Sequence, residues 1–140
     1  MPTKKSIQAP ATADRAPKTM RVFKTALFAK SARKDGITDK DLCVAIEEVM
    51  KGQYDADLGG GVYKKRLNKN MHRSIILAKA GKRWVYEYLF AKNERANIDN
   101  DEEQGYKMLA KSYAALTDTQ LNQLIAHKKL LEICNDCKED

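Results

Sequence analysis

Three consecutive segments between residues 62 and 91 have the side-chain alternation of β-strands, and they constrain the fold of this chain more than any other feature. The segments are Val62–Leu67, residues 73–79 and Arg83–Ala91. Ala80-Gly81, between the last two segments, is a tight-turn signal that predicts a β-hairpin. Strands joined by such short connections pair in an antiparallel arrangement, because parallel pairing needs a longer crossover. The middle of the chain therefore predicts an antiparallel β-meander.

Helical patterns precede this meander. Residues 22–26 predict a short first strand, and residues 27–34 predict a short helix that ends at Asp35-Gly36. Thr38 then predicts an N-cap, and the apolar residues of the segment 39–51 recur at helical spacing. These two helices should form a hairpin that covers one face of the sheet.

Two further helices are predicted after the meander. The first spans about residues 99–116 and has acidic residues at its N-terminus, where they are favourable. The second begins at a capping box of Thr117 and Gln120 and continues to Leu131, because apolar residues follow at helical spacing. The expected fold class is therefore α+β, a small antiparallel β-sheet packed against an N-terminal helical hairpin and C-terminal helices.

The length of the chain predicts one domain with a short segment on either side of it. Residues 1–20 contain all three prolines and no periodic apolar residues, so we expect a disordered N-terminal extension. Residues 21–133 are the expected domain, and residues 134–140 are an expected flexible acidic tail. The sequence has neither the apolar run of a secretory signal nor about 18 consecutive apolar residues. We therefore expect a cytoplasmic protein with no membrane partner.

The cysteines and the motif content predict no cofactor. Three cysteines are an odd number, which argues against a disulfide framework and fits a reducing cytoplasm. Cys134 and Cys137 form a CxxC pair, but a structural zinc usually needs four ligands, and only Cys43, His72 and His127 remain in the chain. We expect two free thiols in a frayed end, and no metal. The chain also lacks a Walker loop, a GxGxxG motif and an HExxH motif.

Positive charge is concentrated in the middle of the chain. The 140 residues include 26 Lys and Arg against 19 Asp and Glu, which gives a net charge of +7. Residues 21–95 hold 17 basic and 9 acidic residues, whereas residues 96–140 hold 5 basic and 9 acidic residues. This distribution indicates a polyanionic partner that meets the middle of the chain.

The densest basic stretch runs from Lys64 to Arg95 and contains ten basic and two acidic residues. Because side chains alternate on a strand, Lys64 and Arg66 should share one face and Lys65 should lie on the other. Arg73, at the start of the next strand, should join Lys64 and Arg66 on a surface suited to a backbone phosphate. A lysine-rich face that only keeps the protein soluble is the other interpretation. We prefer the phosphate surface, because the basic residues repeat on successive strands near one end of the sheet.

Two sequence strings and one arginine in this region are similar to the motifs of a known family. They are GGGVYKKRL at residues 59–67, Arg73 at the start of the next strand, and FAKNERANI at residues 90–98. Together they resemble the RelE/HigB-type toxins of bacterial type II toxin–antitoxin systems, which belong to the RelE/ParE superfamily. The resemblance covers residues 21–133, the whole of the expected domain.

The resemblance implies a RelE-like fold and a ribosome-dependent mRNA endoribonuclease that inhibits translation. In this family the 2′-hydroxyl of the mRNA attacks the adjacent phosphate without a metal, and a positive cluster stabilises the charge that develops. The resemblance also implies two partners. One is a cognate antitoxin, in this branch often a helix-turn-helix protein, and the other is the 70S ribosome with its mRNA.

The motif positions assign expected roles to individual residues. Lys64 and Arg66 match the basic pair on the strand after the glycines, and Arg73 matches the arginine of the next strand, so these three are expected catalytic residues. The expected RNA-binding residues are Lys65, Lys69, Lys92, Asn93 and Arg95.

The general acid and base are not given by these motifs. Asn93 and Asp99 stand where better-studied relatives have an arginine and a tyrosine. His72 is the candidate that remains, because a histidine titrates near neutral pH. The alternative is that His72 is a surface residue at the edge of its strand, without a catalytic role.

Two other functions stay open at this point. One is a ParE-like toxin that inhibits gyrase by binding, and the other is a non-catalytic RNA- or DNA-binding regulator. A basic sheet face fits all three functions, whereas the two sequence strings favour the nuclease.

The sequence also leaves two ways in which a basic site could be silenced. The antitoxin could cover Lys64, Arg66 and Arg73, or the chain could shield them with its own acidic tail. We favour the antitoxin, because the charges of a tail are screened beyond about 8 Å at physiological salt. The acidic residues of the tail region are Glu132, Asp136, Glu139 and Asp140.

Overall fold

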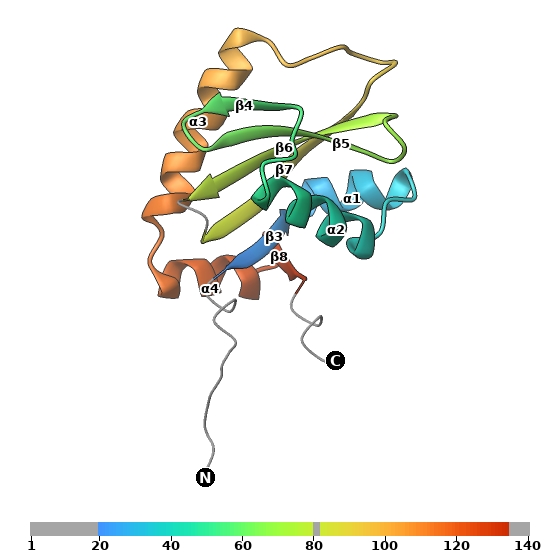
Figure 1. Cartoon of the computed structure of the whole chain (residues 1–140). Coiled ribbons are helices and arrows are strands. Elements are labelled where there is room, and N and C mark those ends of the chain that lie inside the picture. Colours follow the sequence, from blue (N-terminus) through green and yellow to red (C-terminus); the bar gives the residue numbers. More distant parts are fainter. Residues whose placement is uncertain (1–19, 80–81, 135–140) are drawn as a thin grey trace.

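The structure, a computed structural model, describes residues 20–79 and 82–134, which form one β-sheet with helices on both of its faces (Figure 1). The predicted α+β class is confirmed. The predicted N-terminal extension, the Ala80-Gly81 turn and residues 135–140 lie outside the described residues. In chain order the elements are β3 (Arg21–Thr25), α1 (Ala26–Lys34), α2 (Asp39–Met50), β4 (Ala56–Gly59), β5 (Val62–Leu67), β6 (His72–Lys79), β7 (Arg83–Ala91), α3 (Asn100–Ala115), α4 (Asp118–Ala126) and β8 (Leu130–Ile133).

The six strands are arranged in the order β4-β5-β6-β7-β3-β8. Strands β5 to β7 form the antiparallel meander that the sequence predicts, and β4 adds a further antiparallel strand at its edge. Strand β3 then lies parallel to β7 and antiparallel to β8, so the two ends of the domain meet at one side of the sheet. The parallel pair was not predicted, because sequence alternation gives the strands but not the neighbours of a strand that is distant along the chain.

Helices α1 and α2 cover one face of the sheet, which we call the α1/α2 face. Phe28 and Leu42 pack there against Ile76 and Tyr86 of the central strands, all of them buried. The hydroxyl of Tyr86 donates a 2.7 Å hydrogen bond to the carbonyl of Leu42, which satisfies a buried polar group. Burial raises the pKa of Tyr86, so this hydroxyl keeps its proton. The predicted helical hairpin therefore covers a sheet face as expected.

The opposite face is covered by α3 and α4, and we call it the α3/α4 face. Val62, Ile75 and Leu77 of the meander form a second core there with Ala110 of α3 and Leu121 of α4. Both cores are apolar, and the two layers of helices hold the sheet between them. No helix within the described part of the chain has the length and apolar character needed to cross a membrane.

Three helices begin at capping boxes, each within a residue of the start that the sequence predicts. Thr38 caps α2 and Thr117 caps α4, each accepting a hydrogen bond from the backbone three residues on. Asp99 caps α3 in the same way, together with Glu102. The acidic residues at the start of α3 therefore satisfy free backbone N–H groups and also favour the positive end of the helix.

Two short strands of the structure were not predicted. Residues 130–133 continue the apolar spacing of α4, but α4 ends at Ala126 and Lys128 takes a positive φ of 60°. Leu130–Ile133 then pairs with β3, and this pairing outweighs the local helical pattern. At the other edge, Ala56–Gly59 precedes a turn of glycines and pairs with β5.

A β-bulge in the pairing of β6 with β7 changes the face on which one aromatic residue lies. Ile75 lies opposite Tyr88 and Ile76 lies opposite Tyr86, so Glu87 is the extra residue of β7. Trp84 and Tyr86 therefore belong to the core of the α1/α2 face, whereas Tyr88 packs on the α3/α4 face. Strict alternation along β7 would place these three aromatic residues on one side.

Gly61→Ala should destabilise the fold, because Gly61 sits in the tight connection between β4 and β5. It has a φ of +83°, and a Cβ at this position would lie 2.5 Å from the carbonyl oxygen of Ala78. We expect a loss of about 2–4 kcal/mol in the free energy of unfolding, measured by urea denaturation. The control is Gly36→Ala, which has a φ of +73° but no atom within 4 Å of the added Cβ, and should cost only about 1 kcal/mol. Equal losses in both variants would contradict the close approach at Gly61.

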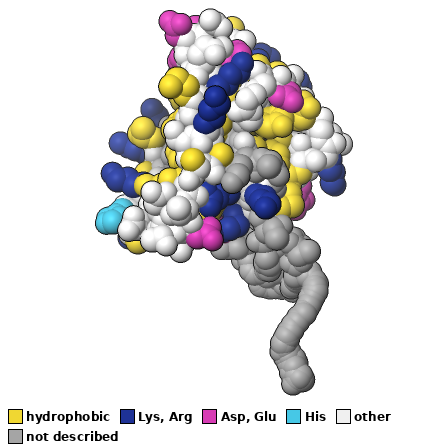
Figure 2. Space-filling model, turned by 90° about the vertical axis from the view of Figure 1, so that its left-hand side faces the viewer, with side chains coloured by type: hydrophobic (Ala, Val, Ile, Leu, Met, Phe, Trp, Pro, Cys, Tyr) yellow, Lys and Arg dark blue, Asp and Glu magenta, His cyan; other side chains and the backbone are white. Residues whose placement is uncertain are grey.

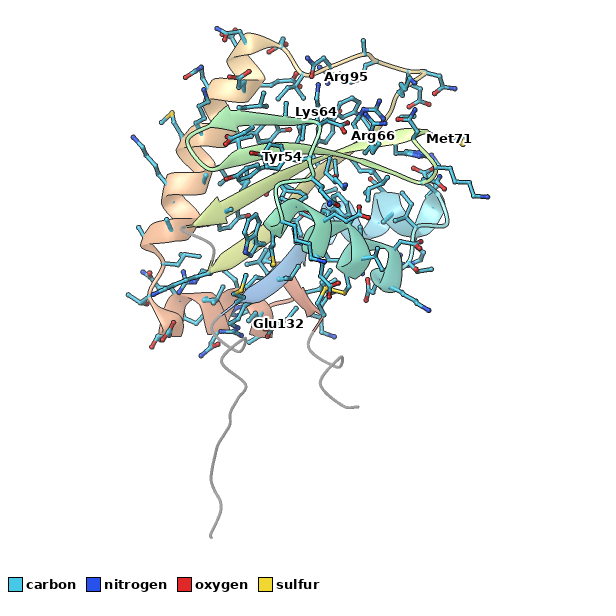
Figure 3. The ribbon with its side chains drawn as sticks, viewed as in Figure 1. Tyr54, Lys64, Arg66, Met71, Arg95 and Glu132 are labelled. Atoms are coloured by element: carbon cyan, nitrogen blue, oxygen red, sulfur yellow. A yellow bond between two sulfur atoms is a disulfide. The ribbon has the colours of Figure 1, made fainter. Side chains whose placement is uncertain are left out.

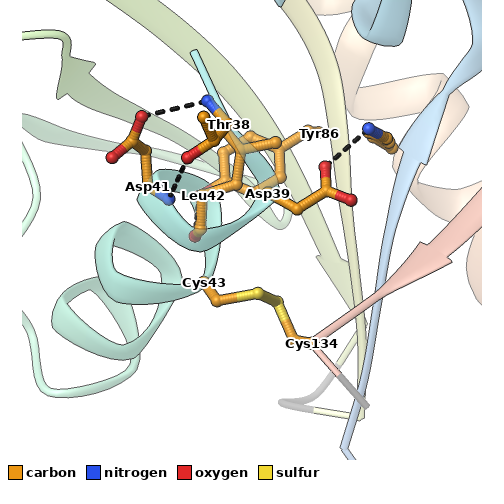
Figure 4. Close-up of a disulfide and its surroundings, with 8 residues drawn as sticks. Thr38, Asp39, Asp41, Leu42, Cys43, Tyr86 and Cys134 are labelled. Carbon is orange, nitrogen blue, oxygen red and sulfur yellow. Dashed lines mark hydrogen bonds and ion pairs between the residues drawn. A yellow bond between two sulfur atoms is a disulfide. The ribbon is translucent and has the colours of Figure 1, made fainter. Parts of the chain in front are cut away.

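A disulfide joins Cys43 of α2 to Cys134, the residue that follows β8, with their Cα atoms 5.5 Å apart (Figure 4). The prediction that Cys134 is a free thiol in a frayed end is therefore wrong. The CxxC spacing drew attention to Cys137, which lies outside the described residues, whereas the bonded partner is 91 residues away. Pairing of β8 with β3 brings the end of the domain beside α2, and sequence spacing does not show this.

Candidate nucleic-acid interface

The α3/α4 face changes from apolar to basic along β5. Val62 is buried, Lys64 is half-buried and Arg66 is exposed, although all three side chains lie on the same face. Arg66 lies directly opposite Arg73 of β6, so two guanidinium groups meet at the same end of the sheet. Figure 3 shows Lys64, Arg66 and Arg95 along one border of the sheet, with Glu132 at the opposite border. We call Lys64, Arg66, Arg73 and Arg95 the basic cluster.

One carboxylate joins the two arginines of the strands. Arg66 Nε donates a 2.8 Å hydrogen bond to Asp55 Oδ1, and Arg73 Nε lies 3.1 Å from Asp55 Oδ2. Asp55 precedes β4, and its backbone N–H donates to the carbonyl of Lys64 at 2.8 Å. The side chains of Asp55 and Arg73 are only 12% and 14% exposed, whereas that of Arg66 is 56% exposed. The carboxylate therefore sits below the surface, and Arg66 reaches out from it.

Arg95 is held by several groups of the protein, although its side chain is 32% exposed. Its guanidinium makes a bidentate pair with Glu102 of α3, at 2.6 and 3.1 Å, and donates to the hydroxyl of Tyr88 at 3.2 Å. It also lies over the rings of Tyr88 and Phe90, with distances of 5.9 and 5.6 Å to the ring centroids. These hydrogen bonds lower the pKa of Glu102 and raise that of Arg95, so both groups stay charged at neutral pH.

Asn97 connects Lys64 with Arg95. Lys64 Nζ donates to Asn97 Oδ1 at 3.3 Å, and Arg95 Nε donates to the Asn97 carbonyl at 3.0 Å. The segment after β7 is thereby folded back over the meander, and its FAKNERANI string contributes to the same surface as the GGGVYKKRL string. The two strings that carry the family resemblance thus meet in space.

Lys65 and His72 do not belong to the basic cluster. Lys65 is buried on the α1/α2 face, where Nζ pairs with Glu48 at 2.8 Å and donates to the carbonyl of Gln53 at 3.0 Å. His72 lies on that face as well and is 7% exposed, with Nε2 3.1 Å from Asp35. The description of His72 as a surface residue is wrong. The side chains of His72 and Arg73 lie on opposite faces of the sheet, because the two residues are adjacent on one strand. His72 is therefore separated from the phosphate surface.

The other predicted RNA-binding residues lie on two neighbouring loops. Lys69 is exposed in the turn between β5 and β6, and Lys92 and Asn93 are exposed after β7. The backbone N–H of Lys92 donates to the carbonyl of Met71 at 2.9 Å, so the two loops are in contact. These exposed side chains border the end of the sheet that carries Arg66 and Arg73.

Sequence reasoning missed four residues of this site. Only one of them lies in a sequence motif from which its role could have been predicted. Asp55 and Glu102 are carboxylates far from the basic strings, and their pairing with arginine depends on tertiary structure. Tyr88 meets Arg95 only because the bulge in β7 sets its face, and local alternation does not show this. Asn97 is inside the FAKNERANI string, so its participation could have been expected from the string itself.

The arrangement is suited to bind an anion at its open end. Basic side chains elsewhere do not form a comparable group on the side that Figure 2 presents, where Lys and Arg are scattered among hydrophobic and uncharged side chains. In the basic cluster, by contrast, four cations come from β5, β6 and the segment after β7. Convergent guanidinium groups match the geometry of a phosphate.

Comparison with known proteins gives a family for the chain. The model of the family described as the RelE toxin of the RelE / RelB toxin–antitoxin system matches residues 20–133. No curated protein matches the chain. The matched range contains every helix and strand described above, from β3 to β8. The chain therefore belongs to the RelE toxin family.

Proposed function

We propose that this chain inhibits translation by cutting mRNA on the ribosome, as a ribosome-dependent endoribonuclease. Membership of the RelE family makes it the toxin of a toxin–antitoxin system, with an antitoxin as its partner. The observation that supports the nuclease is the basic cluster, in which Arg66 and Arg73 meet at an open end of the sheet. This function requires the protein to act where ribosomes are, so we place it in the cytoplasm.

In the proposed reaction the 2′-oxygen of one nucleotide forms a bond to the adjacent phosphorus. The bond from phosphorus to the 5′-oxygen of the next nucleotide breaks, the 2′-hydroxyl loses its proton and the leaving oxygen gains one. Negative charge grows on the non-bridging oxygens during this exchange. Guanidinium groups fixed close to these oxygens lower the barrier, and this kind of stabilisation is often the largest single contribution to catalysis.

The hydrogen-bond pattern shows which cations have donors left for a phosphate. Among the described residues, Arg66 uses only Nε, so its two terminal nitrogens remain for a ligand. Arg73 uses Nε and Nη1 within the protein, which leaves Nη2. Arg95 uses all three nitrogens, so we assign it the role of holding the loop rather than the phosphate. Lys64, half-buried beside Asn97, supplies a charge at the edge of the same surface.

The antitoxin silences this site in our proposal by covering the basic cluster or by preventing entry into the ribosome. Resemblance to one branch of the family suggests a helix-turn-helix protein for this partner. The alternative is that the acidic tail shields the basic cluster. One of the acidic residues expected in that tail, Glu132, is not available for this role. Glu132 lies in β8, where it pairs with Arg21 at 2.8 Å at the border opposite the cluster.

Primer extension on cellular mRNA after induction of the chain tests the proposed function. We expect growth arrest together with new 5′ ends inside translated regions, and the same ends when purified ribosomes, mRNA and protein are mixed. A matched sample without ribosomes should show no cleavage. Growth arrest with unchanged mRNA ends and accumulating DNA breaks would contradict the nuclease and favour gyrase inhibition. No growth arrest at all would favour a regulator.

A further inference from the structure

We propose that Asp55 is a positioning residue, which holds the guanidinium groups of Arg66 and Arg73 in the orientation that receives one phosphate. This inference rests on the proposed function, because it concerns the same phosphate site. Nothing in the family motifs pointed to Asp55, which lies before β4 and outside both sequence strings.

The geometry of the clamp is the first argument. Each carboxylate oxygen of Asp55 takes one arginine, and both arginines use the Nε edge of the guanidinium for this contact. A guanidinium carries five N–H donors in a rigid planar fork. When the Nε edge is fixed, the terminal nitrogens of the exposed Arg66 and the Nη2 of Arg73 keep no hydrogen bond within the described residues. Asp55 thus leaves free the donors that a phosphate would use.

The electrostatics of the pair is the second argument. Arg66 and Arg73 occupy directly opposed positions on antiparallel strands, where like charges repel. Asp55 is the one carboxylate among the described residues that contacts either of them, and its side chain is 12% exposed. A carboxylate with little access to water interacts more strongly with its partners than an exposed one. It therefore offsets the repulsion and restricts two flexible side chains before substrate arrives.

These arguments predict opposite effects on binding and on turnover. Removing the negative charge of Asp55 makes the surface more positive, which favours a polyanion. Removing the clamp lets the guanidinium groups rotate, and a misplacement of about 1 Å can cost on the order of 10²-fold in rate. A residue with a merely structural role would weaken both quantities together.

Asp55→Asn is the variant that separates the two effects. We expect this variant to lower kcat for ribosome-dependent cleavage by about 10- to 100-fold. A short RNA with 2′-O-methyl groups cannot be cut, and the variant should bind it at least as tightly as the wild-type protein does. Asp55→Glu keeps a carboxylate and should recover part of the lost kcat. The control is Glu47→Gln, which changes the charge equally at an exposed residue of α2 whose side chain has no hydrogen bond or ion pair among the described residues. This control should leave kcat unchanged.

Three results would overturn the proposal. Cleavage by Asp55→Asn at the wild-type rate would show that no positioning is needed. Faster cleavage would make Asp55 a competitor of the substrate instead of a support. A large fall in Tm together with loss of RNA binding in both Asp55 variants would make it a structural residue.

A measurement without ribosomes keeps this proposal separate from the nuclease activity. The Nε–H groups of Arg66 and Arg73 should give sharp signals in nitrogen-15 NMR spectra of the wild-type protein, because both are held by Asp55. Asp55→Asn should broaden both signals, and Glu47→Gln should leave them sharp. Unchanged signals in Asp55→Asn would overturn the clamp. Absence of mRNA cleavage by a wild-type protein with sharp signals would contradict only the proposed function.

Discussion

Arg66→Ala and Arg73→Ala should each lower the rate of mRNA cleavage by on the order of 10²–10³-fold and abolish growth arrest. Each substitution removes a donor that faces the phosphate in our proposal, and neither removes volume from the two apolar cores. Arg66 gives the cleaner test, because its side chain is 56% exposed and has Asp55 as its one hydrogen-bond or ion-pair partner among the described residues. The measurement is the rate of appearance of new mRNA ends with purified ribosomes.

Arg73 needs a second variant, since its Nη1 also donates to the carbonyls of Asn70 and His72 in the turn after β5. Arg73→Lys keeps the charge but not the planar fork, so it should cut more slowly than the wild type and faster than Arg73→Ala. Lys111→Ala removes one positive charge from the exposed side of α3 and serves as the control. Growth arrest that persists in both alanine variants would place the active surface elsewhere.

The parts of the fold that could be predicted are those that depend on local chemistry. Alternation along Val62–Leu67 correctly placed Lys64 and Arg66 on one face and Lys65 on the other. The Thr38 and Thr117 caps were visible because a capping box needs only residues three apart. The strand bounds at Arg83–Ala91 also agree with the prediction.

The parts that could not be predicted depend on partners that are distant along the chain. Lys65 was an expected RNA-binding residue and His72 a candidate general acid or base, but both are buried, with Glu48 and Asp35 of the helical hairpin as their partners. The bulge after Tyr86 moved Tyr88 to the other face, where it meets Arg95. A one-residue shift inverts every side chain that follows it, and no local pattern shows where such a shift occurs.

The same limit applies to the charge of the site. The sequence predicted a cluster of free cations, whereas the structure shows cations paired with Asp55 and Glu102. These acidic residues come from the segment before β4 and from α3, outside the basic stretch. The surface is therefore less positive and more ordered than the count of lysines and arginines indicates, which favours orientation of a phosphate over general attraction of a polyanion.

Opening the disulfide should lower the stability of the fold strongly. The bond joins Cys43 to Cys134 across 91 residues of sequence, so it removes much of the conformational freedom of the unfolded chain. Bonds that close long loops contribute about 2–4 kcal/mol. We expect Cys43→Ala to lower the Tm by roughly 10 °C, and a reducing agent to do the same to the wild-type protein.

Measuring the Tm of the wild-type protein and of the cysteine variants, each with and without a reducing agent, gives the contribution of this disulfide to stability. Cys43→Ala and Cys134→Ala should have similar Tm values, and neither should respond to the reducing agent. Hydrogen exchange should locate the loss of protection first in β8, because this edge strand has one strand neighbour, β3, and the disulfide fixes its end to α2. Under the proposed function the protein meets a thiol-reducing compartment, where such bonds are open to reduction. A Tm of the wild-type protein that does not change on reduction would show that the pairing of β8 with β3 alone is sufficient to hold this side of the sheet.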